Sequence, residues 1–268
     1  MLDLLTDYSF LQNAVIGAFL ASIVCGIIGT IIIEKKLVMM SGGIAHTSFG
    51  GIGLGFFLNV EPIYSALLFT MVSAIAIVKL KKKTETNSDT LIGIFWATGM
   101  ALGILFISFT PGYPPQIASY LFGDILTITD TDVVLMILLV SIVSFTVISL
   151  FNYWKAYLFD EEFLQVIGVN AAIMEYMLFI IIALTIVVLI RVVGIILVIA
   201  LLTTPPAIAR FFTYNLKKMM IIAVIIGFII SLAGLWLSYQ FDIASGASII
   251  ILAGITYMSI AFKLRYNI

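Results

Sequence analysis

The chain has 268 residues, of which 63% are hydrophobic and 10% are charged, whereas an ordinary soluble domain is about a quarter charged. Its formal net charge of -1 gives no basic excess for nucleic acid, its single cysteine excludes an intrachain disulfide, and it contains no P-loop motif for a nucleotide. Lipid is therefore the expected solvent, and the predicted fold class is an all-α, polytopic helical membrane protein.

The chain contains about nine apolar runs that are long enough to cross a bilayer, since a spanning helix needs about 20 mostly apolar residues. We place these runs at 13–33, 37–58, 62–79, 91–109, 133–151, 173–191, 194–213, 219–239 and 246–262. With the N-terminus outside and the C-terminus inside, every lysine and arginine except Arg191 falls on the inner side. The positive-inside rule therefore supports an odd number of spans.

The second run contains the only histidine of the chain, His46, within the glycine-rich sequence MMSGGIAHTSFGGIGLG at 39–55. Glycines three, four or seven residues away share its side of a helix: Gly42, Gly43, Gly50 and Gly53. Small residues let another helix backbone approach closely, so His46 is expected to face protein or a cavity. It is then either a packed histidine hydrogen-bonded to a neighbouring helix or an ionisable group that lines a path or binds a transition metal.

The predicted outer side has two notable features. A loop at 110–132 contains three acids, Asp124, Asp130 and Asp132, and by composition it is a solvated acidic loop. Arg191 is the only basic residue on this side. We expect Arg191 to snorkel to the outer interface, with pairing to an acid at an outer gate as the alternative.

On the predicted inner side, the segment FDEEFLQVIGV at 159–169 carries signals that begin and end a short helix. Its start has Asp160, Glu161 and Glu162, and Gly168 lies near its end. Acids at a helix N-terminus and a glycine after its C-terminus are cap signals. The sequence therefore predicts a short surface helix, which without further information is a plain connecting helix.

The seventh run contains consecutive prolines, Pro205 and Pro206, in the sequence LLTTPPAIAR. Two prolines remove two backbone donors, so the helix is expected to bend or break there. Thr203 and Thr204 can satisfy the freed carbonyls or line a path. A kink that only helps the helices to pack is the alternative.

These motifs together resemble the membrane-spanning subunit of ABC-type metal-ion importers, the zinc, manganese and iron permease family. The resemblance covers nearly the whole chain and follows the family's order. Its segments are the histidine-bearing second run, DTLIGIFWATGMALGILFIS at 89–108, SYLFGDIL at 119–126, FDEEFLQVIGV at 159–169, VGIILVIALLTTPPAIARFF at 193–212 and FDIASGASIII at 241–251. No single segment is specific, but their combination and spacing are.

The resemblance implies the fold of type II ABC importer permeases, with 1–268 as a single transmembrane domain in the cytoplasmic membrane. Two copies of the chain would form a translocation path between them. Two separate ATPase subunits would bind the inner faces, and an extracellular solute-binding protein would deliver a divalent metal ion for transport by alternating access. No cofactor is expected on this chain, and its remaining partner is the lipid bilayer.

The resemblance also assigns residues to these roles. The metal or path residues are His46, Gly42, Ser41, Thr203, Thr204 and Pro205. The helix that couples the chain to the ATPase contains Phe159, Asp160, Glu161, Glu162, Phe163, Leu164 and Gly168. Its packing anchors would be Phe159, Phe163 and Leu164. Docking of the binding protein would involve Asp124, Asp130 and Asp132.

The chain departs from the family pattern one helical turn before His46, where most members have an acid and this chain has Gly42. The missing carboxylate has three interpretations. In the first, another acid such as Glu61 or Glu175, or a second His46 across a dimer, supplies the missing ligand. In the second, softer side chains contribute, namely Met39, Met40 and Cys25. In the third, the cargo is a metal chelate or another small solute. A bare transition-metal ion is the preferred cargo. Zinc is preferred over manganese, because a site with imidazole and without carboxylate suits zinc better.

An intramembrane enzyme is a different class of function that the motifs exclude. No HExxH motif surrounds His46, and no serine or aspartyl protease motif is found. A single histidine without an adjacent acid offers few groups that could act as a general base in catalysis. A passive channel is disfavoured because the 159–169 segment resembles a coupling helix. The chain is therefore predicted to be a transporter subunit, with ATP hydrolysis on a separate subunit.

Overall fold

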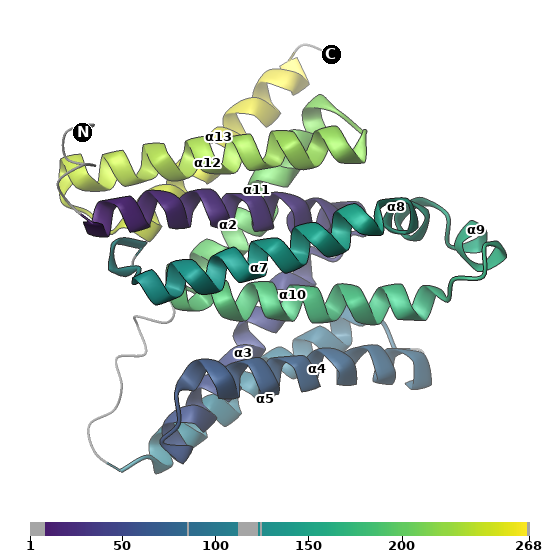
Figure 1. The fold of residues 1–268 in the computed structure, drawn as a ribbon, viewed down its shortest axis with the longest axis horizontal. Coiled ribbons are helices and arrows are strands. Elements are labelled where there is room, and N and C mark those ends of the chain that lie inside the picture. The colour runs from purple at the N-terminus through teal and green to yellow at the C-terminus, as the bar shows by residue number, and fades with distance from the viewer. Residues whose placement is uncertain (1–8, 85, 112–122, 124, 267–268) are drawn as a thin grey trace. The chain divides into compact units, whose positions relative to one another are not determined.

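The computed structural model describes residues 9–84, 86–111, 123 and 125–266. Every regular element in these residues is a helix (Figure 1), which confirms the all-α prediction. The helices are α2 (Ser9–Glu34), α3 (Val38–Leu58), α4 (Pro62–Thr84), α5 (Ser88–Phe109), the 3-10 turn η1 (Ile125–Thr127), α7 (Asp130–Ser149), α8 (Phe151–Phe159), α9 (Glu161–Val166), α10 (Ala171–Val193), α11 (Ile195–Phe212), α12 (Leu216–Phe241) and α13 (Ser245–Tyr266).

Each predicted apolar run corresponds to one long helix, to within a few residues at either end. Within the described residues, eight helices are long and apolar enough to cross a membrane: α2, α4, α5, α7, α10, α11, α12 and α13. Helix α3 is long enough, with 21 residues, but it is less apolar than these eight helices, because glycines, hydroxyl residues and His46 lower its mean hydropathy. The ninth span and the side of each terminus therefore stay predictions.

The helices form two compact units. The first unit comprises Met1–Lys36, Ala118–Thr146 and Leu189–Ile268, and the second comprises Leu37–Ile117 and Val147–Val188. In the first unit, α2 packs against both α11 and α12, and α13 packs against the same two helices. In the second unit, α3 packs against both α4 and α5.

The contact between α3 and α5 depends on glycine, as the sequence predicts for the small-residue side of α3. A Cβ added at Gly53 would lie only 2.7 Å from the Cα of Gly103, and a Cβ added at Gly99 would lie 2.7 Å from the Cα of Thr47. Real Cβ atoms do not approach backbone so closely. The two helices therefore touch through their backbones, which is how membrane helices associate by packing alone.

The two prolines do not break their helix, because α11 continues through Pro205 and Pro206 to its end. Pro206 has no N–H to donate to the carbonyl of Leu202, one turn earlier. That carbonyl faces Gly29 of α2, where an added Cβ would collide with its oxygen. The expected break is thus absent, and the freed carbonyl is covered by the close approach of α2.

Candidate functional site

His46 lies on α3 and stacks its imidazole on the indole of Trp96 from α5. The ring centroids are 4.5 Å apart and the rings are nearly parallel, with an angle of 3° between them. His46 is partly exposed, and its Nδ1 atom is buried without a hydrogen-bond partner among the described residues. The alternative of a packed histidine hydrogen-bonded to a neighbouring helix therefore gains no support from Nδ1, and the role of His46 as a path residue stays a prediction.

The six predicted path residues lie on α3 in the second unit and on α11 in the first. Ser41 and Pro205 are buried, whereas His46, Gly42, Thr203 and Thr204 are partly exposed. The hydroxyl of Ser41 donates to the carbonyl of Val38 at 2.8 Å, and that of Thr203 donates to the carbonyl of Ile199 at 2.8 Å. Both hydroxyls are thus satisfied within their own helices, and His46 is the ligand-type side chain of the set.

Within the described residues, neither Glu61 nor Glu175 supplies the missing acid next to His46. Glu175 is held by Lys81 and Lys82, so it does not serve His46. Glu61 directly precedes Pro62, and Pro62 packs against Gly55 of α3. Gly55 is nine residues after His46, so the two are about 14 Å apart along the helix axis, at about 1.5 Å per residue. No group of three or more His, Cys, Asp or Glu side chains in the described residues could hold a metal ion.

The softer candidates for a metal site are also placed by the structure. Met40 and Cys25 are almost completely buried, while Met39 is 54% exposed at the start of α3. Within the described residues, Cys25 belongs to no group of three or more His, Cys, Asp or Glu side chains that could hold a metal ion.

The predicted short helix at 159–169 is present as α9, and both of its expected caps are observed. The carboxylate of Asp160 accepts a hydrogen bond from the N–H of Phe163 at 2.9 Å. Gly168 has a φ of +79°, its N–H donates to the carbonyl of Gln165 at 3.0 Å, and the following N–H donates to the carbonyl of Leu164 at 3.1 Å. This is a Schellman ending, which favours glycine because of the positive φ.

The two faces of α9 differ strongly in exposure. Leu164 is fully buried, so it anchors α9 to its own chain, and its predicted role as an anchor for a partner is wrong. The other apolar side chains of this segment are exposed: Phe159, Phe163, Val166 and Ile167, with Val166 83% exposed. Sequence reasoning missed Val166 and Ile167. A helical wheel of this segment separates Val166 from Leu164, whereas Ile167, three residues after Leu164, is on the same side of the wheel.

A cavity of about 360 Å³ opens beside α9. It lies among the end of α7, the start of α8 and the segment of α9, and its lining residues are Ile148, Ser149, Phe151, Asn152, Tyr153, Phe163 and Ile167. Phe163 and Ile167 therefore belong both to the exposed face of α9 and to the wall of a hollow.

Arg191 pairs with Asp132, in agreement with the alternative prediction of an acid partner, and its place at an outer gate stays a prediction. The Nε of Arg191 lies 2.6 Å from a carboxylate oxygen of Asp132. The other oxygen accepts hydrogen bonds from the backbone N–H and hydroxyl of Thr129, at 3.0 and 2.6 Å, which forms a capping box at the start of α7. Asp132 is only 5% exposed, so it is not available as a docking residue.

The other acids of the predicted docking loop have different environments. Asp130 is exposed and accepts a hydrogen bond from the side-chain amide of Asn13 at 2.9 Å; the same amide donates to the carbonyl of Ile128 at 3.2 Å. Asp124 lies outside the described residues. Asp130 is therefore the only one of the three acids that the described structure presents on the surface.

Two functional candidates were missed at the sequence level. Trp96 is one, although the 89–108 motif already contained it. The other is the contact of Glu175 with Lys81 and Lys82, which joins helices far apart in the sequence. Nearby, burial raises the pKa of Tyr157 in α8, and the negative charges of Glu175 and Glu161 raise it further.

Residues 7–263 match the family described as the ABC 3 transport family. An uncharacterized membrane protein of Synechocystis sp. is 40% identical over 258 residues, covering 96% of this chain and 92% of that protein. The manganese import system permease protein ScaB of Streptococcus gordonii is 34% identical over 268 residues, covering 98% of this chain and 95% of that protein. Among solved structures, PsaBC from Streptococcus pneumoniae in complex with Fab matches with a TM-score of 0.86 and 31% identity, covering 97% of this chain and 93% of that chain.

Proposed function

This chain belongs to the ABC 3 transport family, and we propose that it is the membrane permease subunit of an ATP-driven importer of a divalent transition-metal ion. The observation that carries this proposal is the match over nearly the whole chain to a manganese import system permease protein. The chain is a multi-pass protein of the cell membrane, and its described residues contain eight helices long and apolar enough to cross it. The chain is not itself an enzyme, and ATP hydrolysis belongs to a separate subunit.

Manganese is the first cargo to test, because a relative that covers 98% of this chain is named for manganese import. Zinc, which the sequence alone favoured, is the competing cargo, since a lone imidazole without a carboxylate suits zinc better. A metal chelate is less well supported, because the relative's name refers to the metal itself.

Two copies of the chain form the path. The described residues of one chain offer His46 but no cluster that would surround an ion, and a buried cation needs its charge and coordination satisfied. A second copy would bring a second imidazole to the same path. The partial exposure of His46 supports a role for this side chain in contact with the cargo.

Transport proceeds by alternating access. ATP binding brings two ATPase subunits together, α9 moves with them, and the path opens to the other side of the membrane. The exposed apolar side chains of α9, Phe163 and Val166 among them, supply the contact with the ATPase. A solute-binding protein delivers the ion outside, with Asp124 and Asp130 as the proposed contact residues.

The test is ion uptake by the complete importer, made of this chain with its ATPase subunit and binding protein, in sealed proteoliposomes. We expect uptake of radioactive Mn²⁺ that requires ATP on the ATPase side, and stronger competition from unlabelled Mn²⁺ than from Zn²⁺. Stronger competition from Zn²⁺ would reverse the order of the two metals. Uptake of neither ion above the ATP-free control would contradict metal import.

A further inference from the structure

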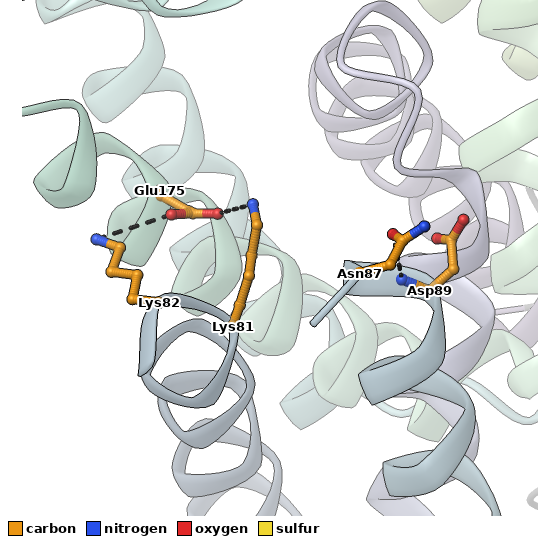
Figure 2. A network of polar contacts seen from close by, with 5 residues as sticks. All are labelled: Lys81, Lys82, Asn87, Asp89 and Glu175. Carbon is orange, nitrogen blue, oxygen red and sulfur yellow. Dashed lines mark hydrogen bonds and ion pairs between the residues drawn. The ribbon is translucent and has the colours of Figure 1, made fainter. Parts of the chain in front are cut away.

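Glu175 lies in the second turn of α10, and its side chain is only 12% exposed. One carboxylate oxygen lies 2.6 Å from the Nζ of Lys81 and the other lies 3.8 Å from the Nζ of Lys82. Figure 2 shows the carboxylate held between the two ammonium groups. A nearly buried carboxylate is stable only when its charge is matched in this way.

Both lysines belong to the last turn of α4. Lys82 also lies over the ring of Tyr176, 4.9 Å from its centroid, which adds a cation–π contact. The end of α4 thus contacts two consecutive residues of α10. We call this set of four residues, Lys81, Lys82, Glu175 and Tyr176, the α4–α10 clasp.

The clasp is joined to α9 by a short turn that contains several hydrogen bonds. Helix α9 ends in the glycine cap at Gly168, and Asn170 directly precedes α10. The side chain of Asn170 accepts from the N–H of Ala172 at 2.8 Å, and its carbonyl accepts from the N–H of Ile173 at 2.9 Å. Because this connection is short and hydrogen-bonded at both ends, displacement of α9 is expected to shift the first turns of α10, which carry Glu175.

At its other end, α4 is packed on α3 through glycines. A Cβ added at Gly51 would collide with backbone at Ser65 and Ala66, and one added at Gly55 would lie 2.7 Å from the Cα of Pro62. Contacts of backbone on backbone leave no flexible side chain to absorb a shift. Movement of α4 is therefore passed to α3, which carries His46.

We propose that Glu175 is a positioning residue for transport, which transmits the movement of α9 through the α4–α10 clasp to α4 and from there to α3. The inference rests on the proposed function, because it needs an ATPase that moves α9. Glu175 contacts neither the cargo nor the ATPase in this role. All of the residues involved lie in the second unit.

The experiment measures Mn²⁺ uptake and ATP hydrolysis side by side in proteoliposomes that contain the complete importer. In E175Q, the side chain keeps its size but loses the charge that both lysines face. We expect the number of Mn²⁺ ions carried per ATP to fall about tenfold, within the range typical of coupling between sites, while hydrolysis and the folded amount are retained. Lys83→Gln is the matched control, since Lys83 lies in the same turn and is exposed, and its ratio should stay at the wild-type value.

Exchange of the charges distinguishes coupling from simple stability. K81E and E175K should each lower the ratio, and the double variant should recover it relative to both single variants. A wild-type ratio in E175Q, or a fall in uptake that follows the loss of folded protein, would overturn the role of the clasp and leave the proposed function standing. Absence of ATP-dependent uptake in the wild-type importer would overturn both.

Discussion

Helices α3 and α9 are held in opposite ways. Helix α3 is packed on both α4 and α5 through glycines and presents one ligand-type side chain, His46. Helix α9 is six residues long, is held by its two caps and by buried Leu164, and leaves most of its apolar side chains exposed. The difference indicates that α3 gains its position from backbone packing and α9 from local hydrogen bonds. Substitutions should therefore affect folding at α3 and partner contact at the exposed face of α9.

The largest expected effect is that of Gly53→Leu in α3. A side chain at this position meets the backbone of Gly103, which does not move without displacing α5. We expect the free energy of unfolding to fall by more than about 3 kcal/mol, the upper range for overpacking, and little folded protein to be recovered in detergent. Folded yield and denaturant unfolding in micelles provide the measurement.

The control for this change is Gly93→Leu in α5. A Cβ added at Gly93 meets no described heavy atom within 4 Å, so the same side chain should be tolerated there. Equal losses at Gly53 and Gly93 would mean that the close contact of α3 with α5 is not what positions α3.

The next effect in size is that of Leu164→Ala in α9. Leu164 is the fully buried side chain of this helix, and removal of a buried leucine costs about 2 to 5 kcal/mol. Because α9 is short and at the surface, we expect a value near the low end, measured by the same unfolding titration. Unchanged stability would show that α9 is not anchored to its own chain through this residue.

A smaller effect is expected from Gly168→Ala, which places a Cβ on a residue with a φ of +79°. An L residue in this backbone region costs about 1 kcal/mol or somewhat more. Space is not the cause, since an added Cβ meets no described heavy atom within 4 Å. Loss of the Schellman cap should also lower ions carried per ATP. Unchanged stability together with an unchanged ratio would argue against a rigid end to α9.

The smallest effect on stability is expected from Phe163→Ala, because Phe163 is 53% exposed. Surface substitutions usually stay within about 0.5 kcal/mol. Metal uptake should nevertheless fall while the protein remains folded and inserted, because the ATPase loses its apolar contact. A variant with normal uptake would remove Phe163 from the coupling surface.

Much of this arrangement follows from local sequence. The caps at Asp160 and Gly168 involve residues a few positions apart, so their pattern is visible before folding. The glycine-rich side of α3 around His46 likewise shows as a spacing of three and four residues. Such features are set within one or two turns of a helix.

The errors have a different origin, because they depend on residues far apart in the chain. The sequence does not reveal that Arg191 meets Asp132, or that Trp96 stacks on His46, since both contacts depend on how helices pack. Leu164 was assigned to a partner because its exposure depends on tertiary packing. Pro205 and Pro206 were expected to bend or break α11; the helix continues through them, and a neighbouring helix covers the freed carbonyl.

The most direct test of the account compares His46→Ala with wild type in the complete importer, with Mn²⁺ uptake and folded amount measured on the same preparation. If His46 lines the path, uptake should fall sharply while folded amount and unfolding free energy remain near wild type. A purely structural histidine gives the opposite result, with folded protein lost and uptake per folded molecule unchanged. That result would contradict the assignment of α3 to the metal path.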